Sequence, residues 1–232
     1  MPLPRLTPAV LAQRTVPSRG AGILNRKGKP VNLAVSRTES SRRRPARITS
    51  RQLPERWSQQ LQLDDGRILW LRPLDPADAE PIRQTFSLLS PEEIRMRFLH
   101  PVKELTPDMT RRLTELDPSH EFALVAAEPL PPGEALVGAV ARLSIDEGTR
   151  RAEYAILVSH FLTGKGLGRM LMKQLIRWAR LKRLDEIYGD VLDENTAMLD
   201  LARSLGFRRE MLPDDPGIVR VRLDLRRKPS LQ

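Results

Sequence analysis

The stretch from Ile156 to Lys182 most restricts how this chain can fold. An apolar run, Ile156-Leu157-Val158, is followed after five residues by the glycine-rich segment 164–169, Gly-Lys-Gly-Leu-Gly-Arg. From there apolar residues recur at spacings of four and three, which places them on one stripe of a helix; they are Leu167, Leu171, Leu175 and Trp178. The pattern predicts a strand, a glycine-rich loop, and a helix from about Leu167 to Lys182.

Such a loop can bind an anion, because a helix N-terminus offers unpaired N–H groups and the positive end of the helix dipole. Glycines let a phosphate come close, and Lys165 and Arg169 add positive charge. A mononucleotide P-loop needs Lys followed by Ser or Thr, which is missing here. A dinucleotide loop needs a glycine where Arg169 stands. Another phosphorylated ligand, or a connector with no ligand, remains open.

The rest of the pattern predicts an α/β (α+β) fold, a mixed and mostly antiparallel sheet flanked by helices. Three helix starts share a capping residue followed by proline: Asp75-Pro76, Ser90-Pro91 and Thr106-Pro107. A further helix covers 196–205, and Gly206 ends it. Strands are expected at 68–72, 122–127, 136–145, 151–158, 186–192 and 218–225.

Charge and aromatic residues divide the chain near Pro54. Residues 1–54 hold twelve Lys and Arg, one acidic residue and no aromatic residue, whereas the remainder holds 27 basic and 28 acidic residues. We therefore expect a disordered basic N-terminal tail over 1–54 and one folded domain over 61–227. Because the basic charge lies in the tail, we expect nucleic acid to bind the chain only through weak tail contacts.

Several classes of function are disfavoured by what the sequence lacks. It has no cysteine, so disulfides, thiolate metal sites and catalytic thiols are excluded. No apolar run approaches the roughly 18 residues of a membrane span, and the N-terminus has no apolar secretory segment. We expect a cytoplasmic protein that binds neither a membrane nor a metal.

The glycine segment and its surroundings resemble the GNAT N-acetyltransferases. The family signature is Gln/Arg-x-x-Gly-x-Gly/Ala, and here Thr163, Gly166 and Gly168 occupy its first, fourth and sixth places. The run from Leu71 to Leu225 is similar to the C-terminal domain of bacterial Pat-type protein lysine acetyltransferases. The supporting phrases are LSPEEIRMRFLHPVKELT, AEYAILV, GKGLGRMLM and ENTAMLDLARSLGF.

The resemblance implies a binding site for acetyl-CoA. Its pyrophosphate would contact the backbone N–H groups of Gly164, Lys165, Gly166, Leu167, Gly168 and Arg169, beside Thr163. The main chain of Leu157 and Val158 would bind the pantetheine arm, and Asn195 would contact the far side of the cofactor. Two positions depart from the family. Thr163 replaces a long polar side chain, and Ala202 stands where the family often has a tyrosine that acts as general acid.

Glu153 is the candidate general base, since it is the one acid in the apolar run Ala152–Val158. It matches a strand glutamate that serves this role in many GNAT lysine acetyltransferases, and apolar surroundings would raise its pKa toward neutral pH. A structural role is the alternative. A hairpin turning at Glu147-Gly148 would set Arg142 opposite Glu153 as a cross-strand ion pair. His100, His120 and His160 are solitary and are expected at surface positions.

The predicted function is transfer of an acetyl group from acetyl-CoA to a primary amine, with a protein lysine as the expected acceptor. A non-catalytic acyl-CoA-binding sensor or adaptor is the alternative, and an RNA- or ribosome-associated acetyltransferase guided by the tail is a third possibility.

Overall fold

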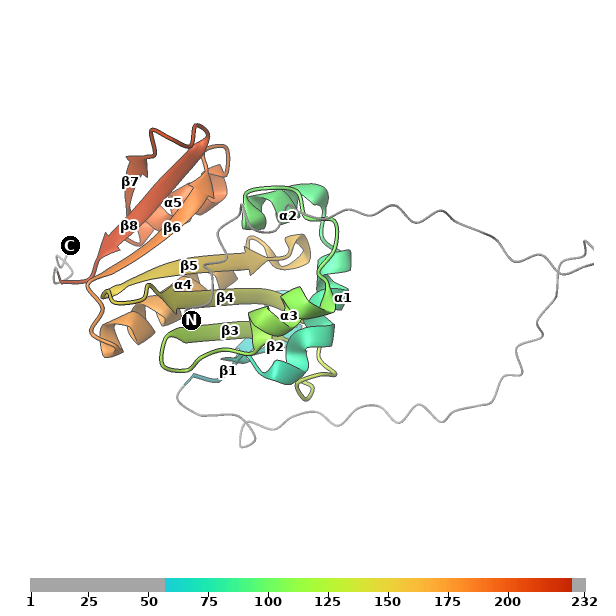
Figure 1. Cartoon of the computed structure of the whole chain (residues 1–232). Helices are drawn as coiled ribbons and strands as arrows, with labels where there is room; N and C mark the ends of the chain where they lie inside the picture. The colour runs from blue at the N-terminus through green and yellow to red at the C-terminus, as the bar shows by residue number, and fades with distance from the viewer. Residues whose placement is uncertain (1–56, 227–232) are drawn as a thin grey trace, which may run out of the picture. The chain divides into compact units, whose positions relative to one another are not determined.

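A computed structural model describes residues 57–226, which contain one eight-stranded mixed sheet. The predicted tail, 1–54, lies outside the described residues. The strands are β1 (Gln59–Gln62), β2 (Ile68–Pro73), β3 (Glu121–Ala127), β4 (Val137–Ile145), β5 (Arg151–Val158), β6 (Glu186–Leu192), β7 (Arg208–Met211) and β8 (Ile218–Asp224). Their order in the sheet is β1-β2-β3-β4-β5-β6-β8-β7 (Figure 1). Within the described part, β5 with β6 is the one parallel pair.

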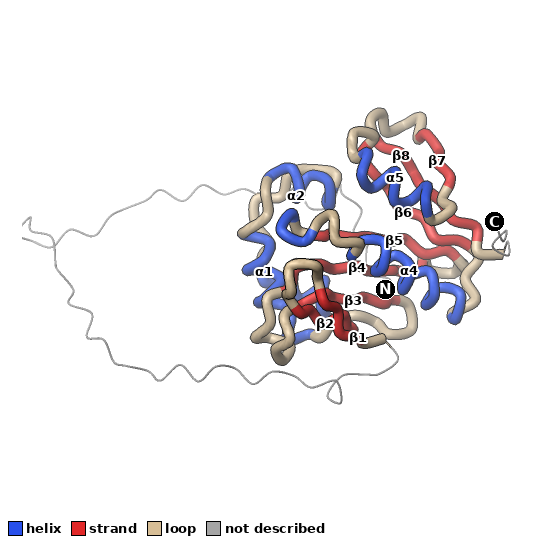
Figure 2. Tube along the Cα trace, turned by 180° about the vertical axis from the view of Figure 1, so that it is seen from behind, coloured by secondary structure: helices blue, strands red, loops and turns tan. Residues whose placement is uncertain are grey.

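Helices cover both faces of this sheet. They are α1 (Ala79–Ser87), α2 (Pro91–Phe98), α3 (Pro107–Thr114), α4 (Leu167–Leu181) and α5 (Thr196–Ser204), with short 3-10 turns η3 (Pro76–Asp78) and η4 (His160–Leu162). The helices α1 to α3 lie on one face and α4 and α5 on the other (Figures 1 and 2). The predicted fold class is confirmed.

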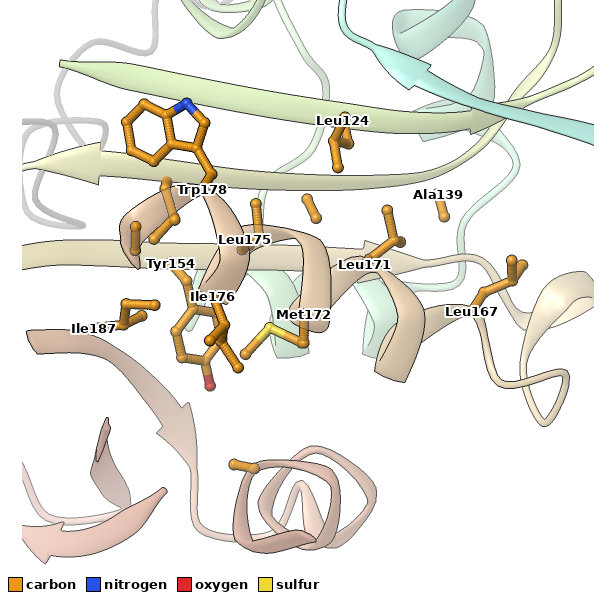
Figure 3. Close-up of a cluster of buried hydrophobic side chains, with 14 of the residues drawn as sticks. Leu124, Ala139, Tyr154, Leu167, Leu171, Met172, Leu175, Ile176, Trp178 and Ile187 are labelled. Carbon is orange, nitrogen blue, oxygen red and sulfur yellow. The ribbon is translucent and has the colours of Figure 1, made fainter. Parts of the chain in front are cut away.

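The predicted apolar stripe of α4 forms the centre of the main core. Leu167, Leu171, Leu175 and Trp178 are all buried, and they pack against β3, β4 and β5 (Figure 3). A smaller core lies on the other face, where α1 and α2 bring Phe86, Leu89 and Ile94 together beside Leu157. Helix packing on both faces gives β5 a fixed position, and the candidate site lies along this strand.

The N-cap predictions at the helix starts are confirmed by hydrogen bonds. Ser90 and Thr106 accept the backbone N–H groups of Glu93 and Met109, and Asp75 caps η3, which leads into α1. The helix predicted from Asp75 therefore begins as a 3-10 turn. The buried ion pair of Arg72 with Asp78 holds this turn against β2, at 2.6 and 2.7 Å.

Two further differences from the sequence prediction concern strands. The edge strand β1 was not expected, because three of its four residues are glutamine and only Leu61 is buried. The turn between β4 and β5 is longer than predicted. The Asp146 N–H donates a hydrogen bond to the Arg151 carbonyl, which leaves four residues in the turn. Ser144 therefore lies opposite Glu153, and Arg142 lies opposite Ala155. The predicted Arg142–Glu153 cross-strand pair is wrong, because Arg142 instead forms its ion pair with Glu121 of β3.

None of the helices in residues 57–226 is long and apolar enough to cross a membrane. The same residues contain no cluster of His, Cys, Asp or Glu that could hold a metal ion.

Candidate functional site

The strands β5 and β6 separate after a short stretch of pairing and leave an opening between them. Backbone pairing joins residues 151–153 to 186–188 and ends at Glu153 opposite Tyr188. On its other side β5 stays paired with β4 as far as Val158. Within the described residues, the backbone edge of 154–158 that faces β6 has no strand partner. Backbone groups alternate between the two sides of a strand, so the N–H and C=O of Val158 face this edge, whereas those of Leu157 face Val140 of β4. Of the two residues predicted to bind the pantetheine arm, Val158 is the one whose main chain a ligand at this edge could contact.

The narrow end of the opening is closed by one aromatic ring. Tyr154 reaches across to β6, where a Cβ on Gly189 would meet its ring carbons at 2.6 to 2.9 Å. The ring also contacts Phe207 edge to face, with centroids 5.6 Å apart. The absence of a side chain at Gly189 thus lets the Tyr154 ring bridge the two strands.

The wide end of the opening leads to the glycine loop. Gly164 and Gly166 have φ of +75° and +74°, a backbone conformation in which other residues are strained. Gly166 is the N-cap of α4 and no side chain caps this helix, whereas Ser90, Thr106 and Asn195 cap α2, α3 and α5. The first-turn N–H groups of α4 have no acceptor among residues 57–226. They form an uncapped, positively polarised helix end of the kind that binds phosphate.

The side chains predicted around the cofactor mostly have partners within the protein. Lys165 forms an ion pair with Asp65, 3.0 Å away, and Arg169 donates to Ser204 Oγ at 2.7 Å. Thr163 donates its hydroxyl to the carbonyl of His160. Asn195 Oδ1 accepts from the Met198 N–H and so caps α5. The structure therefore favours the backbone, more than these side chains, as the source of contacts to a cofactor.

The β1–β2 turn lies beside the glycine loop. The sequence analysis did not predict this contact. Asp65 binds both Lys165 and Arg67, and these cations hold its pKa well below the usual range. Arg67 also donates to the carbonyl of Phe161, just upstream of the glycines. The sequence shows a turn at residues 64–66 but nothing to link it with a loop a hundred residues away.

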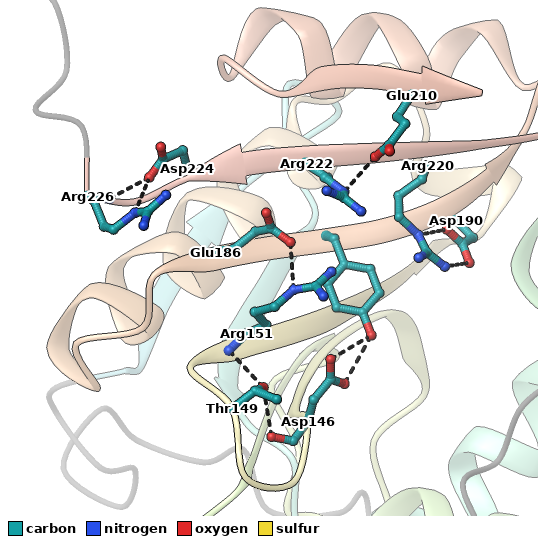
Figure 4. A network of polar contacts seen from close by, with 11 residues as sticks. Asp146, Thr149, Arg151, Glu186, Asp190, Glu210, Arg220, Arg222, Asp224 and Arg226 are labelled. Atoms are coloured by element: carbon teal, nitrogen blue, oxygen red, sulfur yellow. Dashed lines mark hydrogen bonds and ion pairs between the residues drawn. The ribbon is translucent and has the colours of Figure 1, made fainter. Parts of the chain in front are cut away.

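Glu153 lies at the narrow end of the opening, on the sheet face that also carries α2. The neighbouring charged side chains of the strands on this face are paired: Arg151 with Glu186, Arg220 with Asp190 and Arg222 with Glu210 (Figure 4). Arg97 of α2, whose charge also acts on Glu153, forms no ion pair within residues 57–226. The Tyr188 hydroxyl is bound to Asp146 at 3.0 Å. Among residues 57–226, Glu153 has neither a hydrogen bond nor an ion pair, although its side chain is exposed. It is therefore a free carboxylate at the narrow end of the β5–β6 opening.

The surroundings of Glu153 raise its pKa. Partial loss of hydration is the largest cause, and the negative charges of Asp190 and Asp146 act in the same direction. Arg97 of α2 and Arg220 of β8 act in the opposite direction. Because the side chain keeps contact with solvent, we expect a modest shift. The direction suits a base that exchanges a proton near neutral pH.

The remaining candidate positions lie away from this carboxylate. His160 is bound to Glu93 and His120 to Asp117, and the Nδ1 atom of His100 is buried without a partner among the described residues. Ala202 is fully buried in the main core. Ala202 therefore supplies no hydroxyl at the position where the family often has a tyrosine as general acid.

Comparison with known proteins agrees with this arrangement. Residues 69–208 match the model of the acetyltransferase (GNAT) domain family. Over 163 residues the chain is 34% identical to an acetyltransferase of Pseudomonas aeruginosa, covering 70% of this chain and 87% of that protein.

Solved structures give the same result. The GNAT domain of S. lividans PAT superposes with a TM-score of 0.64 and 26% identity, over 74% of this chain and 98% of that domain. The acetyltransferase yncA of Salmonella typhimurium, solved with its cofactor acetyl-CoA, shares the fold with a TM-score of 0.53 and 20% identity, over 71% and 98% of the two chains. Because the family model covers more than half of the chain and the Pseudomonas relative is 34% identical over most of its length, this chain belongs to the GNAT family of acetyltransferases.

Proposed function

We propose that this enzyme transfers the acetyl group of acetyl-CoA to the side-chain amine of a lysine in a protein, with Glu153 as the general base. The observation that carries the proposal is the free carboxylate of Glu153 at the closed end of the β5–β6 opening, beside Arg151 and Arg220, which are paired with other carboxylates.

The cofactor would enter by the wide end of the opening. Acetyl-CoA supplies an activated acyl group on sulfur, which an uncharged amine attacks at the carbonyl carbon. In our proposal the N–H groups at the start of α4 hold the pyrophosphate, and the open β5 edge at Val158 holds the pantetheine arm. Tyr154 closes the narrow end, so the acyl group would stop next to Glu153.

A lysine ammonium fits the charges around Glu153. Asp190 and Asp146 raise the pKa of Glu153, and Arg97 and Arg220 lower it, so the attraction for an arriving ammonium comes from the unpaired carboxylate of Glu153 itself. A lysine ammonium can attack only after it loses a proton, which an ionised Glu153 can accept. The C–N bond then forms at the carbonyl carbon, the C–S bond breaks, and coenzyme A leaves as the thiolate, which solvent can protonate. The face around it consists of partly exposed strand residues of β5, β6 and β8, which suits the approach of a protein segment.

The test is acetylation of a cell lysate with acetyl-CoA, read by mass spectrometry, with the wild type and the Glu153→Gln variant. We expect new acetyl-lysine sites with the wild type and about a hundredfold to ten-thousandfold slower transfer with the variant. Glu147→Gln is a matched control, since Glu147 is an exposed glutamate in the adjoining turn. Equal rates for both variants would remove Glu153 as the base. Acetylation of small amines alone would remove the protein acceptor.

The alternative of a non-catalytic acyl-CoA sensor makes a separate forecast. Ala202 supplies no proton to the departing thiolate, which favours slow turnover. Tight acetyl-CoA binding by the wild type without transfer to any amine would support that alternative.

A further inference from the structure

Side chains of α2 form polar contacts with residues on both sides of the β5–β6 opening. On the β5 side, Glu93 is bound to His160, which follows the strand. On the β6 side, Arg95 forms an ion pair with Glu194, directly before the cap of α5. The helix lies next to the C-terminal end of β5 in Figure 1.

Of these two contacts, the one made by Glu93 is the more protected. Its side chain is 17% exposed, whereas Arg95 and Glu194 are 40% and 49% exposed. Exposed ion pairs contribute little. The Glu93 carboxylate accepts the backbone N–H of His160 at 2.7 Å and contacts its ring Nδ1 at 3.1 Å. It also accepts the Ser90 N–H at 2.8 Å, which completes the capping box of α2.

His160, which Glu93 holds in place, is hydrogen-bonded in turn to the residue before the glycine loop. The carbonyl of His160 accepts both the backbone N–H and the hydroxyl of Thr163, at 3.3 and 2.8 Å. Thr163 immediately precedes Gly164, whose left-handed conformation begins the loop. Hydrogen bonds therefore join the Glu93 carboxylate to His160, and the His160 carbonyl to Thr163, the residue that precedes the first glycine.

We propose that Glu93 is a positioning residue for the cofactor, which fixes the glycine loop through His160. The proposal rests on acetyl-CoA binding at this loop. Glycine-rich backbone has large conformational freedom, and ordering it upon binding reduces affinity. Holding His160 in place before the cofactor arrives removes part of that loss. No reacting atom touches Glu93, so its effect should fall on cofactor affinity and not on the rate at saturation.

The experiment measures coenzyme A binding by calorimetry for Glu93→Ala and Glu93→Gln. We expect the dissociation constant to rise about tenfold for alanine and less for glutamine, whose amide oxygen can still accept one N–H. The turnover rate at saturating acetyl-CoA should stay within about twofold of wild type. Glu92→Gln is the charge control, since Glu92 is exposed and has no hydrogen bond or ion pair within residues 57–226. It should leave the affinity unchanged.

A second control separates positioning from helix capping. Ser90→Ala removes the other half of the capping box, the bond from Glu93 N–H to Ser90 Oγ, and does not touch His160. It should lower the melting temperature by about 2–4 °C and leave the affinity within about twofold of wild type. If Ser90→Ala weakens coenzyme A binding as much as Glu93→Ala, capping alone explains the effect and the proposal is wrong.

A double-mutant cycle tests the route through His160. His160→Ala removes the ring contact but keeps the backbone N–H that Glu93 accepts, so it should weaken binding less than Glu93→Ala does and have no further effect when Glu93 is already alanine. Equal effects in both backgrounds, or a Glu93→Ala affinity equal to that of wild type, would overturn the inference. Wild-type protein that fails to bind coenzyme A would instead overturn the proposed function itself.

Discussion

At the scale of the residue, the ionised form of Glu153 lowers the stability of the fold and is also the form that can accept a proton. Its raised pKa means that the folded chain binds the proton more tightly than the unfolded chain does. The stability associated with that proton is present at low pH and is lost as the pH rises through the raised pKa. Near neutral pH the ionised Glu153 therefore opposes folding, while the same ionised form is the one needed to accept a proton.

Glu153→Gln should accordingly be slow but no less stable. At pH 7 we expect a melting temperature equal to or above that of wild type, and near pH 3 the difference should disappear because both side chains are neutral. Raising the pH should partly restore turnover, since more free amine becomes available without a base. Melting curves at the two pH values, measured beside a pH profile of turnover, check this. A variant that is less stable at pH 7 and equally fast would assign a structural role to Glu153.

A second residue-scale prediction concerns the ion pair of Lys165 with Asp65. Asp65→Asn removes an acceptor from the edge of the anion site and frees the Lys165 ammonium for the pyrophosphate. We expect coenzyme A to bind about two- to fivefold more tightly at low salt, with less gain at high salt. Asp64→Asn is the control, since Asp64 is an exposed neighbour with no hydrogen bond or ion pair in the described part of the chain. Weaker binding by Asp65→Asn would mean that Asp65 supports the loop.

At the scale of the element, the loop between β5 and α4 can be tested against a second glycine turn. Gly166 and Gly148 have φ of +74° and +69°, and a Cβ added to either meets nothing within 4 Å. Valine should strain both turns similarly. Only Gly166→Val should abolish coenzyme A binding, because only there does a side chain enter the proposed pyrophosphate site. Calorimetry and melting curves on both variants check this. Equal binding by both would remove the loop from the cofactor site.

A further element-scale prediction concerns how η3 and α1 are held against β2. The bidentate pair of Arg72 with Asp78 is almost fully buried, with side chains 2% and 0% exposed. Arg72→Met would leave Asp78 buried without its countercharge, at a cost of about 3–5 kcal/mol. Chemical denaturation should show this loss, and Arg83→Met at an exposed pair should change stability by less than about 1 kcal/mol.

The strand patterns show what sequence alone can predict at this scale. Alternation along 151–158 puts Glu153 and Tyr154 on opposite faces of the sheet, because side chains alternate whatever the register. The predicted cross-strand partner of Glu153, Arg142, was wrong, since the register between two strands depends on how many residues the turn contains. A turn with two more residues moves the partner by two positions and keeps the face. The edge strand β1 escaped prediction because an edge strand needs little apolar alternation.

At the scale of the whole molecule, the contacts that assemble the site join segments far apart in the chain. The strand–loop–helix unit was predictable because its signals are local. The positions of Asp65 beside the loop and of Glu93 beside His160 were not, since they depend on packing of the β1–β2 turn and of α2. Local patterns thus predicted the glycine loop and the candidate base, and tertiary packing supplies the groups that surround them.

The N-terminal boundary of the domain yields the last prediction. Residues 1–54, which lie outside the described part, carry the excess basic charge and no aromatic residue. Trp57 lies at the start of the described chain and contacts Phe122, whose ring stacks on Trp178 at 5.2 Å, while Arg177 lies over the Trp57 ring. Aromatic packing of this kind stabilises a core edge. The folded unit should therefore need Trp57 and not the residues before Pro54.

Two truncations separate these regions. Deleting 1–54 should preserve the melting temperature and coenzyme A binding and remove retention on heparin at low salt, because the excess positive charge is lost. Deleting 1–58 also removes Trp57 and should lower the melting temperature by about 4–8 °C more, a loss that Trp57→Ala in the full chain should reproduce. A drop of ten degrees or more for the shorter deletion would place residues 1–54 within the folded structure. Unchanged heparin retention would place the binding charge on the domain itself, where Lys173, Arg177 and Arg180 line one groove beside α4.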